Sequence, residues 1–348
     1  MGGLFDDVLK GDEGLFVDEL ALDYDYIPKE IPYRENQQHY IADCMKPLFN
    51  SRSGRNLFIF GSPGIGKTAA IKYIFRELEN NTDDVIPIYV NCWKKDSSYK
   101  VLMDICDQIG YKWTHNKRTD ELMRVISTIL NKKSVVICLD EVDRVKELDI
   151  LYSLCEDLTK KVILVLANDR NWLANLDARV RSRLMAESLE FKPYNFDEIK
   201  GILKKRIDYA FVPDIWENEA LDVVNKKCYT AKDIRVGLFL LRESGNLAEM
   251  KSSKKIIAEY ASSAVSKLEE FKIKDCDEFD PEAQRILELV KENSGLKISD
   301  LYNLYGNDMS YRTFYRKIEE LDKNNMIDMG DKKGKSPVVN YSKKLTEF

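Results

Sequence analysis

The residues with the clearest chemical role form a glycine-rich stretch, GSPGIGKT at 61–68, which matches the pattern GxxxxGK[ST]. An apolar run at 57–60 precedes it and a helical pattern follows, as in loops whose backbone N–H groups wrap phosphates at the start of a helix. We expect Lys67 to reach the β- and γ-phosphates and Thr68 to bind Mg²⁺. The sequence therefore predicts a site for ATP or ADP with Mg²⁺, formed by Gly61, Ser62, Pro63, Gly64, Ile65, Gly66, Lys67, Thr68 and Ala69.

Two later apolar runs, typical of buried parallel strands, also end in polar side chains. Residues 135–139 lead into Asp140 and Glu141, and residues 161–167 lead into Asn168. The carboxyl ends of parallel strands are where such sheets bind ligands. We expect Asp140 to hold Mg²⁺ through water and Glu141 to orient or deprotonate the attacking water. Asn168 either bonds the γ-phosphate or that water, or caps the turn after its strand.

Three arginines follow within five residues: Arg179, Arg181 and Arg183. They form either a solvated, ion-paired helix face or a group from which one arginine reaches the γ-phosphate of a neighbouring subunit.

Composition limits the class of protein. A chain of 348 residues with 44% hydrophobic and 32% charged residues indicates two or three globular domains. We expect a cytoplasmic protein that does not enter a membrane, because no apolar run approaches ~20 residues and the start lacks the features of a signal peptide. Seven scattered cysteines and two histidines make a zinc site improbable, and Cys138 and Cys155 are expected to be buried thiols.

Charge is unevenly distributed. Residues 1–32 carry nine acidic side chains and two lysines, a balance of −7, which leaves +2 for the rest of a chain whose net charge is −5. The acidity therefore belongs to an N-terminal arm, residues 1–26, which we expect to be mobile. The net charge does not exclude nucleic acid as a partner.

The last part of the chain, 281–348, has the pattern of a DNA-reading unit. Helical patterns at 281–295, 297–306 and 310–327, with Ser299 and Ser310 as expected caps, are followed by a hairpin of 327–329 and 338–341, which predicts a winged helix-turn-helix. In the third helix a stripe of Tyr311, Phe314, Ile318 and Leu321 is expected to be buried. Basic hairpins also occur as plain solubility features, and many winged helices mediate protein contacts. The residues expected to contact DNA are Ser310, Arg312, Thr313, Arg316, Lys317, Lys332, Lys333 and Lys335.

The order of these motifs resembles the archaeal origin recognition complex / cell-division-control replication initiator family of AAA+ ATPases. The specific stretches are IPYRENQ at 31–37, LDARVRSRL at 176–184 and KDIRVGLFLLRESGNLAE at 232–249. The resemblance implies an α/β fold with a parallel-sheet AAA+ core at 27–192, an all-helical lid at 193–275 and a winged-helix DNA-binding domain at 281–348.

The resemblance also assigns residues. Ile31, Pro32, Tyr33 and Arg34 match the adenine side of the pocket, and Asn168 matches the family's sensor 1. Arg235 matches the lid arginine that contacts nucleotide, called sensor 2. Arg183, with Arg179 as second choice, matches the finger that acts in trans.

Two further stretches of the sequence, at 94–100 and at Lys232, correspond to places of interest in the family. The family's additional DNA-contacting element falls near Lys94, Lys95, Ser97, Tyr99 and Lys100, where a plain solvated helix start is the alternative. Where the family usually has a glycine before the lid's Asp-x-Arg, this sequence has Lys232, so we expect a changed turn before the lid helix.

The resemblance implies an ATP-dependent initiator that binds duplex origin DNA and recruits the replicative minichromosome maintenance helicase, with slow hydrolysis as a switch. Other initiator copies and a nucleoid location fit this role. The alternatives are a signalling or regulatory ATPase with a DNA-binding winged helix, and a clamp-loader-like subunit. Clamp loaders carry a helical collar where this chain has the winged-helix pattern.

Overall fold

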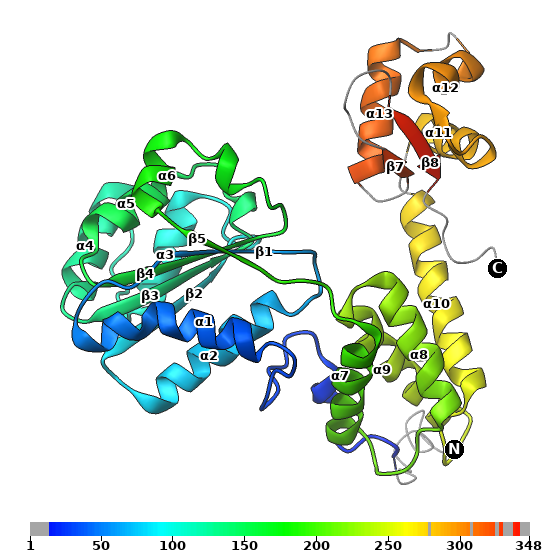
Figure 1. Ribbon diagram of the computed structural model, residues 1–348, viewed down its shortest axis with the longest axis horizontal. Coiled ribbons are helices and arrows are strands. Elements are labelled where there is room, and N and C mark those ends of the chain that lie inside the picture. The colour runs from blue at the N-terminus through cyan, green and yellow to red at the C-terminus, as the bar shows by residue number, and fades with distance from the viewer. Residues whose placement is uncertain (1–13, 278–279, 307–308, 324–326, 330–336, 342–348) are drawn as a thin grey trace, which may run out of the picture. The chain divides into compact units, whose positions relative to one another are not determined.

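The computed structural model describes residues 14–277, 280–306, 309–323, 327–329 and 337–341. The chain divides into two compact units, Met1–Ser262 and Ser263–Phe348 (Figure 1). The division falls within one helix, α10 (Ala258–Asp277). The expected boundary between lid and winged helix at 275–281 therefore stays a prediction.

The first unit is built on a parallel sheet of five strands in the order β2-β3-β4-β1-β5. All four strand pairs are parallel, and β3 and β4 are buried almost throughout. The three apolar runs found in the sequence are central strands of this sheet, as predicted. The strands are β1 (Leu57–Phe60), β2 (Val85–Asn91), β3 (Ser134–Asp140), β4 (Lys161–Ala167) and β5 (Glu187–Glu190).

Helices cover both faces of this sheet (Figure 1). The face that receives Leu57 and Ile59 packs on α1 (Glu35–Met45) and α2 (Lys67–Asn81). Alternation along the strand turns Phe58 and Phe60 to the opposite face, which packs on four helices. These are α3 (Ser98–Gln108), α4 (Thr119–Leu130), α5 (Asp149–Asp157) and α6 (Ala178–Leu184). Cys138 and Cys155 are buried free thiols, as predicted.

Three further helices follow the sheet in the same unit and form the lid: α7 (Phe196–Ala210), α8 (Asn218–Ala231) and α9 (Ile234–Met250). Asn195 and Glu198 form a reciprocal capping box at the start of α7. Lys232, between α8 and α9, has φ 54° and ψ 28°. This is the left-handed conformation that glycine adopts freely, and the lysine adopts it at a cost of roughly 1–2 kcal/mol. The expectation that this turn differs from the family's stays a prediction.

The expectation that the acidic arm is mobile is wrong for residues 14–26. A short 3₁₀ helix, η1 (Glu19–Leu22), packs against α7 and α9, and Ala21 and Leu22 are fully buried. The ring of Phe16 lies 4.6 Å from that of Phe211, and the Val17 N–H donates to Ala210 O at 2.8 Å. Apolar residues interspersed among the acids anchor the segment, and composition alone did not reveal them.

After the end of α10, the described part of the second unit contains three helices and a hairpin, in the order that the sequence predicted for a winged helix-turn-helix. Its helices are α11 (Pro281–Glu292), α12 (Ile298–Tyr305) and α13 (Tyr311–Lys323). The hairpin strands β7 (Ile327–Met329) and β8 (Val338–Tyr341) are antiparallel, and the short β6 (Leu296–Lys297) pairs with β8. Side chains from all three helices and from the hairpin form one core.

Two local expectations for this unit are wrong. Tyr311 packs its ring against Tyr302 but is 41% exposed, so the buried stripe consists of Phe314, Ile318 and Leu321. Ser299 lies inside α12, whose N-cap is Lys297. Ser310 does cap α13, since its hydroxyl accepts from the Thr313 N–H at 3.2 Å.

None of the described helices is long and apolar enough to cross a membrane.

Candidate functional site

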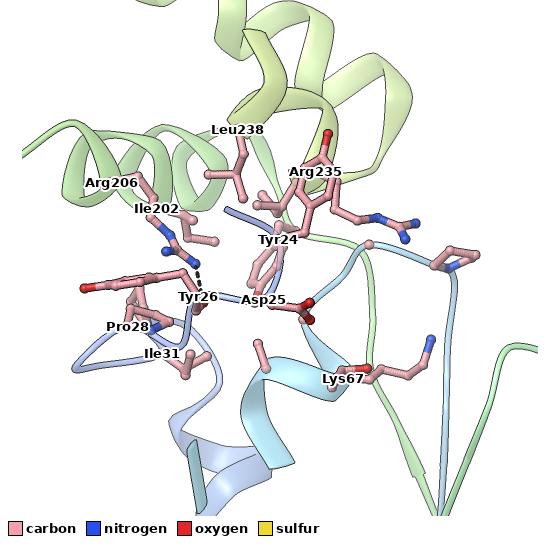
Figure 2. A pocket seen from close by; sticks show the side chains of 18 of the residues that line it. Tyr24, Asp25, Tyr26, Pro28, Ile31, Lys67, Ile202, Arg206, Arg235 and Leu238 are labelled. Atoms are coloured by element: carbon pink, nitrogen blue, oxygen red, sulfur yellow. Dashed lines mark hydrogen bonds between the residues drawn. The ribbon is translucent and has the colours of Figure 1, made fainter. Parts of the chain in front are cut away.

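A pocket of about 270 Å³ lies at the carboxyl edge of the parallel sheet, within the first unit. Its walls come from the phosphate loop, from the ends of β3 and β4, from residues 24–32 and from the lid helices α7 and α9. Figure 2 shows Tyr26 on one side of this pocket and Lys67 and Arg235 on the other, each from a different one of these segments. The topology thus brings together residues that are more than 200 positions apart in the sequence.

The phosphate loop is bent by its glycines. Gly64 and Gly66 have φ of +70° and +88°, which side-chain-bearing residues rarely adopt. The Gly64 α-carbon lies directly against the carboxylate of Asp233, so a side chain at Gly64 would collide with the lid. The N–H of Ile234 donates to Gly64 O at 3.0 Å. The lid therefore closes directly on the loop.

Lys67 is held by the loop and by Asn168. Its ammonium donates to Gly61 O at 2.5 Å, to Ser62 O at 2.9 Å and to Asn168 Oδ1 at 2.9 Å. The side chain is buried, and this burial lowers the pKa of Lys67, opposed by the nearby charges of Asp140 and Glu141. A buried ammonium whose bonds go to neutral oxygens is suited to accept an anionic ligand.

The oxygens expected to bind Mg²⁺ lie together. The Thr68 hydroxyl donates to Asp140 Oδ2 at 2.5 Å, while the Glu141 N–H donates to Oδ1 at 2.9 Å. Among the described residues no group of three or more His, Cys, Asp or Glu side chains forms a metal cage. One carboxylate and one hydroxyl fit Mg²⁺, which keeps several waters and shares its remaining positions with phosphates.

Tyr89 is a site residue that the sequence did not reveal. Its phenol donates to Asp140 Oδ2 at 2.7 Å from the neighbouring strand β2. A tyrosine among apolar strand residues usually packs in the core. Its contact with Asp140 becomes evident only from the pairing of β2 with β3.

Glu141 lines the pocket immediately after β3, in a left-handed conformation with φ 54°. Burial, followed by the charges of Asp140 and Asp143, raises the pKa of Glu141, and Arg144 and Arg235 oppose this shift. A raised pKa makes a carboxylate a stronger base, as a residue that deprotonates water requires.

Arg235 reaches the pocket from the start of α9 and is held there by its own helix cap. Its Nε and Nη2 donate to the two carboxylate oxygens of Asp233 at 3.1 and 2.8 Å. Asp233 also accepts the Arg235 N–H as N-cap of α9. The guanidinium is therefore close to the site but paired with a carboxylate.

At the opposite end of the pocket, aromatic and apolar side chains lie beside the guanidinium of Arg206, which donates to Tyr26 O at 3.4 Å (Figure 2). Tyr24, Tyr26, Pro28, Ile31, Ile202 and Leu238 converge there (Figure 2). Ile31 and Pro32 line the pocket, as the resemblance implied for the adenine side. Tyr24 and Tyr26 were missed because they fall in the segment expected to be mobile.

Tyr33 and Arg34 are not among the lining residues, which corrects their expected place. The Arg34 guanidinium is buried, donates to Ile65 O at 3.1 Å and Lys192 O at 2.7 Å, and lies 3.8 Å from the ring centre of Tyr194. The Tyr33 hydroxyl occupies the space that a side chain at Gly201 would take. Arg34 thus joins the phosphate loop to the segment that follows β5, and Tyr33 packs against α7.

The arginines of α6 lie outside the lining of the pocket. Arg183 pairs with Glu156 at 3.2 Å and Arg179 with Asp177 at 3.2 Å, and all three arginines are exposed. The proposed action of Arg183 or Arg179 in trans stays a prediction.

In the second unit, the residues expected to contact DNA differ in their exposure and in their bonding partners within the protein. Arg312 and Arg316 are exposed on α13, whereas Ser310 and Thr313 are bonded to each other in the helix cap. Lys317 is buried and pairs with Asp280 at 2.5 Å and Glu282 at 3.1 Å. Its charge serves the packing of α13 on α11, so we remove Lys317 from the DNA-contacting set. Lys332, Lys333 and Lys335 lie outside the described residues.

The stretch after β2 has the contacts of a capped helix start. Ser97 caps α3, Lys95 pairs with Asp104 and Lys100 with Asp96. These bonds are consistent with the plain solvated alternative, and the DNA-contacting role of Lys94, Lys95, Ser97, Tyr99 and Lys100 stays a prediction.

Comparison with known proteins agrees with this architecture. Residues 51–174 match the family model described as AAA domain, and residues 200–266 match the Cdc6 AAA+ ATPase-type lid domain. A relative from Methanosarcina mazei named ORC1-type DNA replication protein 2 is 30% identical over 340 residues, spanning 92% of this chain and 91% of that protein.

Solved structures share the fold. The Aeropyrum pernix ORC1 protein in complex with DNA has a TM-score of 0.73 at 23% identity, and each chain is covered to 94%. The Aeropyrum pernix ORC2 protein in ADPNP-ADP complexes has a TM-score of 0.74 at 19% identity, again with 94% of each chain covered. These structures show the shared fold, and the 30% identity to the Methanosarcina mazei protein over 92% of this chain shows the family: this chain belongs to the archaeal ORC1-type DNA replication proteins, which are AAA+ replication initiators.

Proposed function

We propose that this protein is an ATP-dependent replication initiator that binds duplex origin DNA through its winged-helix unit and helps to load the replicative minichromosome maintenance helicase. The observation that carries the proposal is the direct contact between lid and phosphate loop, in which Ile234 donates to Gly64 and Arg235 enters the pocket. A ligand bound at the loop changes this contact, so the nucleotide state becomes a conformational state of the lid.

The chain's own groups bind and orient the nucleotide. The loop N–H groups and Lys67 bind the phosphates, while the apolar end around Tyr26 and Ile31 encloses the base. Thr68 and Asp140 would hold Mg²⁺, which when bound neutralises charge on the phosphates. When the nucleotide binds, the Lys67 ammonium exchanges its neutral carbonyl partners for the anionic oxygens of the phosphates.

Hydrolysis is slow and serves as a switch. Glu141 takes a proton from the attacking water, and Asn168, bonded to Lys67, contacts the water or the γ-phosphate. Arg235 exchanges its pairing with Asp233 for a contact with the nucleotide and so couples the site to α9. Arg183 acts in trans when several initiator copies assemble.

DNA binding uses the exposed arginines of α13. Arg312 and Arg316 contact base edges or phosphates, and the hairpin lysines add phosphate contacts that make affinity salt-dependent. The relative solved in complex with DNA supports this role. Such a protein works on the nucleoid.

Footprinting of the bound DNA across the genome tests the proposal. We expect the binding sites to cluster at replication origins. If ATP binding controls DNA binding, these sites should be lost in cells that carry the Lys67→Ala variant. Sites clustered at promoters would instead favour a regulatory ATPase with a DNA-binding winged helix. Recovery with a sliding clamp and no duplex footprint would favour the clamp-loader-like alternative.

A further inference from the structure

Tyr89 bonds the carboxylate that is expected to hold the metal, and nothing in the proposed mechanism uses it. The phenol reaches Asp140 Oδ2 at 2.7 Å, the same oxygen that accepts the Thr68 hydroxyl at 2.5 Å. The second carboxylate oxygen accepts the Glu141 N–H at 2.9 Å. Three donors thus determine the orientation of one buried carboxylate, two of them at the oxygen nearest to Thr68.

The sheet register explains how Tyr89 reaches Asp140. Tyr89 pairs with Cys138 across β2 and β3, and Asn91 pairs with Asp140. Residues two apart on a strand share a face, so Tyr89 and Asp140 lie on one face, one diagonal step apart. A tyrosine side chain spans that step, while a shorter hydroxyl residue would not. Its position and its length are both needed for the contact.

The tyrosine is itself held in place. β2 is one of the two edge strands of the sheet, and the side chain of Gln108 on α3 bonds both backbone groups of Tyr89, accepting from N at 3.1 Å and donating to O at 2.8 Å. The ammonium of Lys72 on α2 lies 5.3 Å from the ring centre. Helices from both faces of the sheet therefore position this side chain.

We propose that Tyr89 is a positioning residue for Mg²⁺: its hydroxyl holds the Asp140 carboxylate in the orientation in which Asp140 and Thr68 present their oxygens to one ion. The terminal torsion of an aspartate has broad minima, so a carboxylate that loses a donor turns more freely. Groups that orient metal ligands through hydrogen bonds typically contribute 10–100-fold to metal affinity. This inference rests on the proposed Mg²⁺–nucleotide site.

The test is Tyr89→Phe in the full chain, with calorimetric titration of ADP and of a non-hydrolysable ATP analogue, first in EDTA and then over a series of Mg²⁺ concentrations. We expect the Mg²⁺ concentration for half-maximal enhancement of nucleotide affinity to rise about tenfold. Nucleotide affinity without metal should stay within about twofold of wild type, because no phosphate-binding group is changed. A Tyr89→Met variant removes the hydroxyl a second way if the first variant folds poorly.

Tyr40→Phe is the matched control. Tyr40 also donates its phenol to a carboxylate, that of Glu187, but neither residue lines the pocket. It should keep the wild-type Mg²⁺ dependence. In an Asp140→Asn background, Tyr89→Phe should produce no further change in that dependence.

The outcomes separate this inference from the function on which it rests. If Mg²⁺ does not enhance nucleotide binding to the wild-type protein, the proposed metal site is wrong and this inference falls with it. If wild type responds to Mg²⁺ and Tyr89→Phe responds equally, the metal site stands and the role of Tyr89 is wrong. A loss of affinity that is equal with and without Mg²⁺ would also overturn it, because it would indicate general damage to the site.

Discussion

The ammonium of Lys67 donates a 2.9 Å hydrogen bond to Oδ1 of Asn168, which joins the phosphate loop to the residue that follows β4. The two residues are 101 positions apart and meet because β1 and β4 are neighbouring parallel strands. In the proposed mechanism, a phosphate that binds Lys67 therefore also lies close to Asn168.

This bond predicts a difference between two substitutions of Asn168. Asn168→Asp places a carboxylate beside Lys67 and the phosphates, so the affinity for an ATP analogue should fall by more than tenfold. Asn168→Ala removes one neutral acceptor and should change affinity by less than about threefold while lowering hydrolysis about tenfold or more. Calorimetry and a phosphate-release assay measure the two effects. Equal affinities for the two variants would show that Asn168 is not near the bound phosphates.

The environment of Glu141 predicts that a substitution of this residue lowers the rate of ATP hydrolysis but leaves nucleotide binding almost unchanged. Glu141→Gln keeps the shape of the side chain and removes the base, so hydrolysis should fall by about 10²–10⁴-fold. Nucleotide affinity should change little, because Glu141 is not part of the phosphate loop. Near-normal turnover in single-turnover assays would remove Glu141 from the mechanism.

The Asp233–Arg235 pair predicts a gain of affinity from Asp233→Asn. Asparagine caps helices about as well as aspartate, so α9 keeps its start and the free energy of unfolding should change little. The substitution removes a carboxylate next to Gly64 and releases the guanidinium of Arg235. We expect ATP affinity to rise a few-fold in low salt, measured against Arg235→Ala, which should weaken it. A loss of affinity in Asp233→Asn would mean that the pairing orients Arg235 productively.

In the second unit, the exposure and pairing of the basic residues of α13 predict that their substitutions affect DNA binding to different extents. Arg316→Ala or Arg312→Ala should weaken duplex DNA binding, by about 1–3 kcal/mol for a base contact. Lys317→Met should leave DNA affinity and its salt dependence near wild type, since its charge is already paired with Asp280 and Glu282. Fluorescence anisotropy over a range of salt concentrations compares them. A DNA-binding loss in Lys317→Met that matched that of Arg316→Ala would restore Lys317 to the interface.

The turn at Lys232 predicts a stabilising substitution. Lys232→Gly removes the side chain that makes the left-handed backbone conformation unfavourable at this position. The substitution should raise the free energy of unfolding by about 1 kcal/mol. Lys226→Gly, in the interior of α8 and also exposed, is the control and should lower stability by about 1 kcal/mol. Denaturant unfolding of both variants measures the difference. A destabilised Lys232→Gly would show that the lysine side chain contributes more than the turn costs.

Much of the fold was predictable because its signals are local. The apolar runs at 57–60, 135–139 and 161–167 are central parallel strands, and such strands read as continuous hydrophobic segments. The hairpin of β7 and β8 was located to the residue by its alternation. By contrast, the order of the strands and the lid contact with Gly64 depend on long-range packing, which no short stretch encodes.

By itself the sequence determined which residues can do chemistry here: a loop of glycines ending in Lys67 and Thr68, an acidic pair after a buried strand, and exposed arginines at the start of α13. Only the tertiary structure decided which of them act together. It brought Tyr89 to Asp140 and placed Tyr24 and Tyr26 in the lining of the pocket. It also showed that Arg34 bonds a backbone carbonyl and that Lys317 pairs with a carboxylate inside its own unit. The physical reason is that a side chain's type sets which bonds it can make, while burial and strand register set which partner it meets.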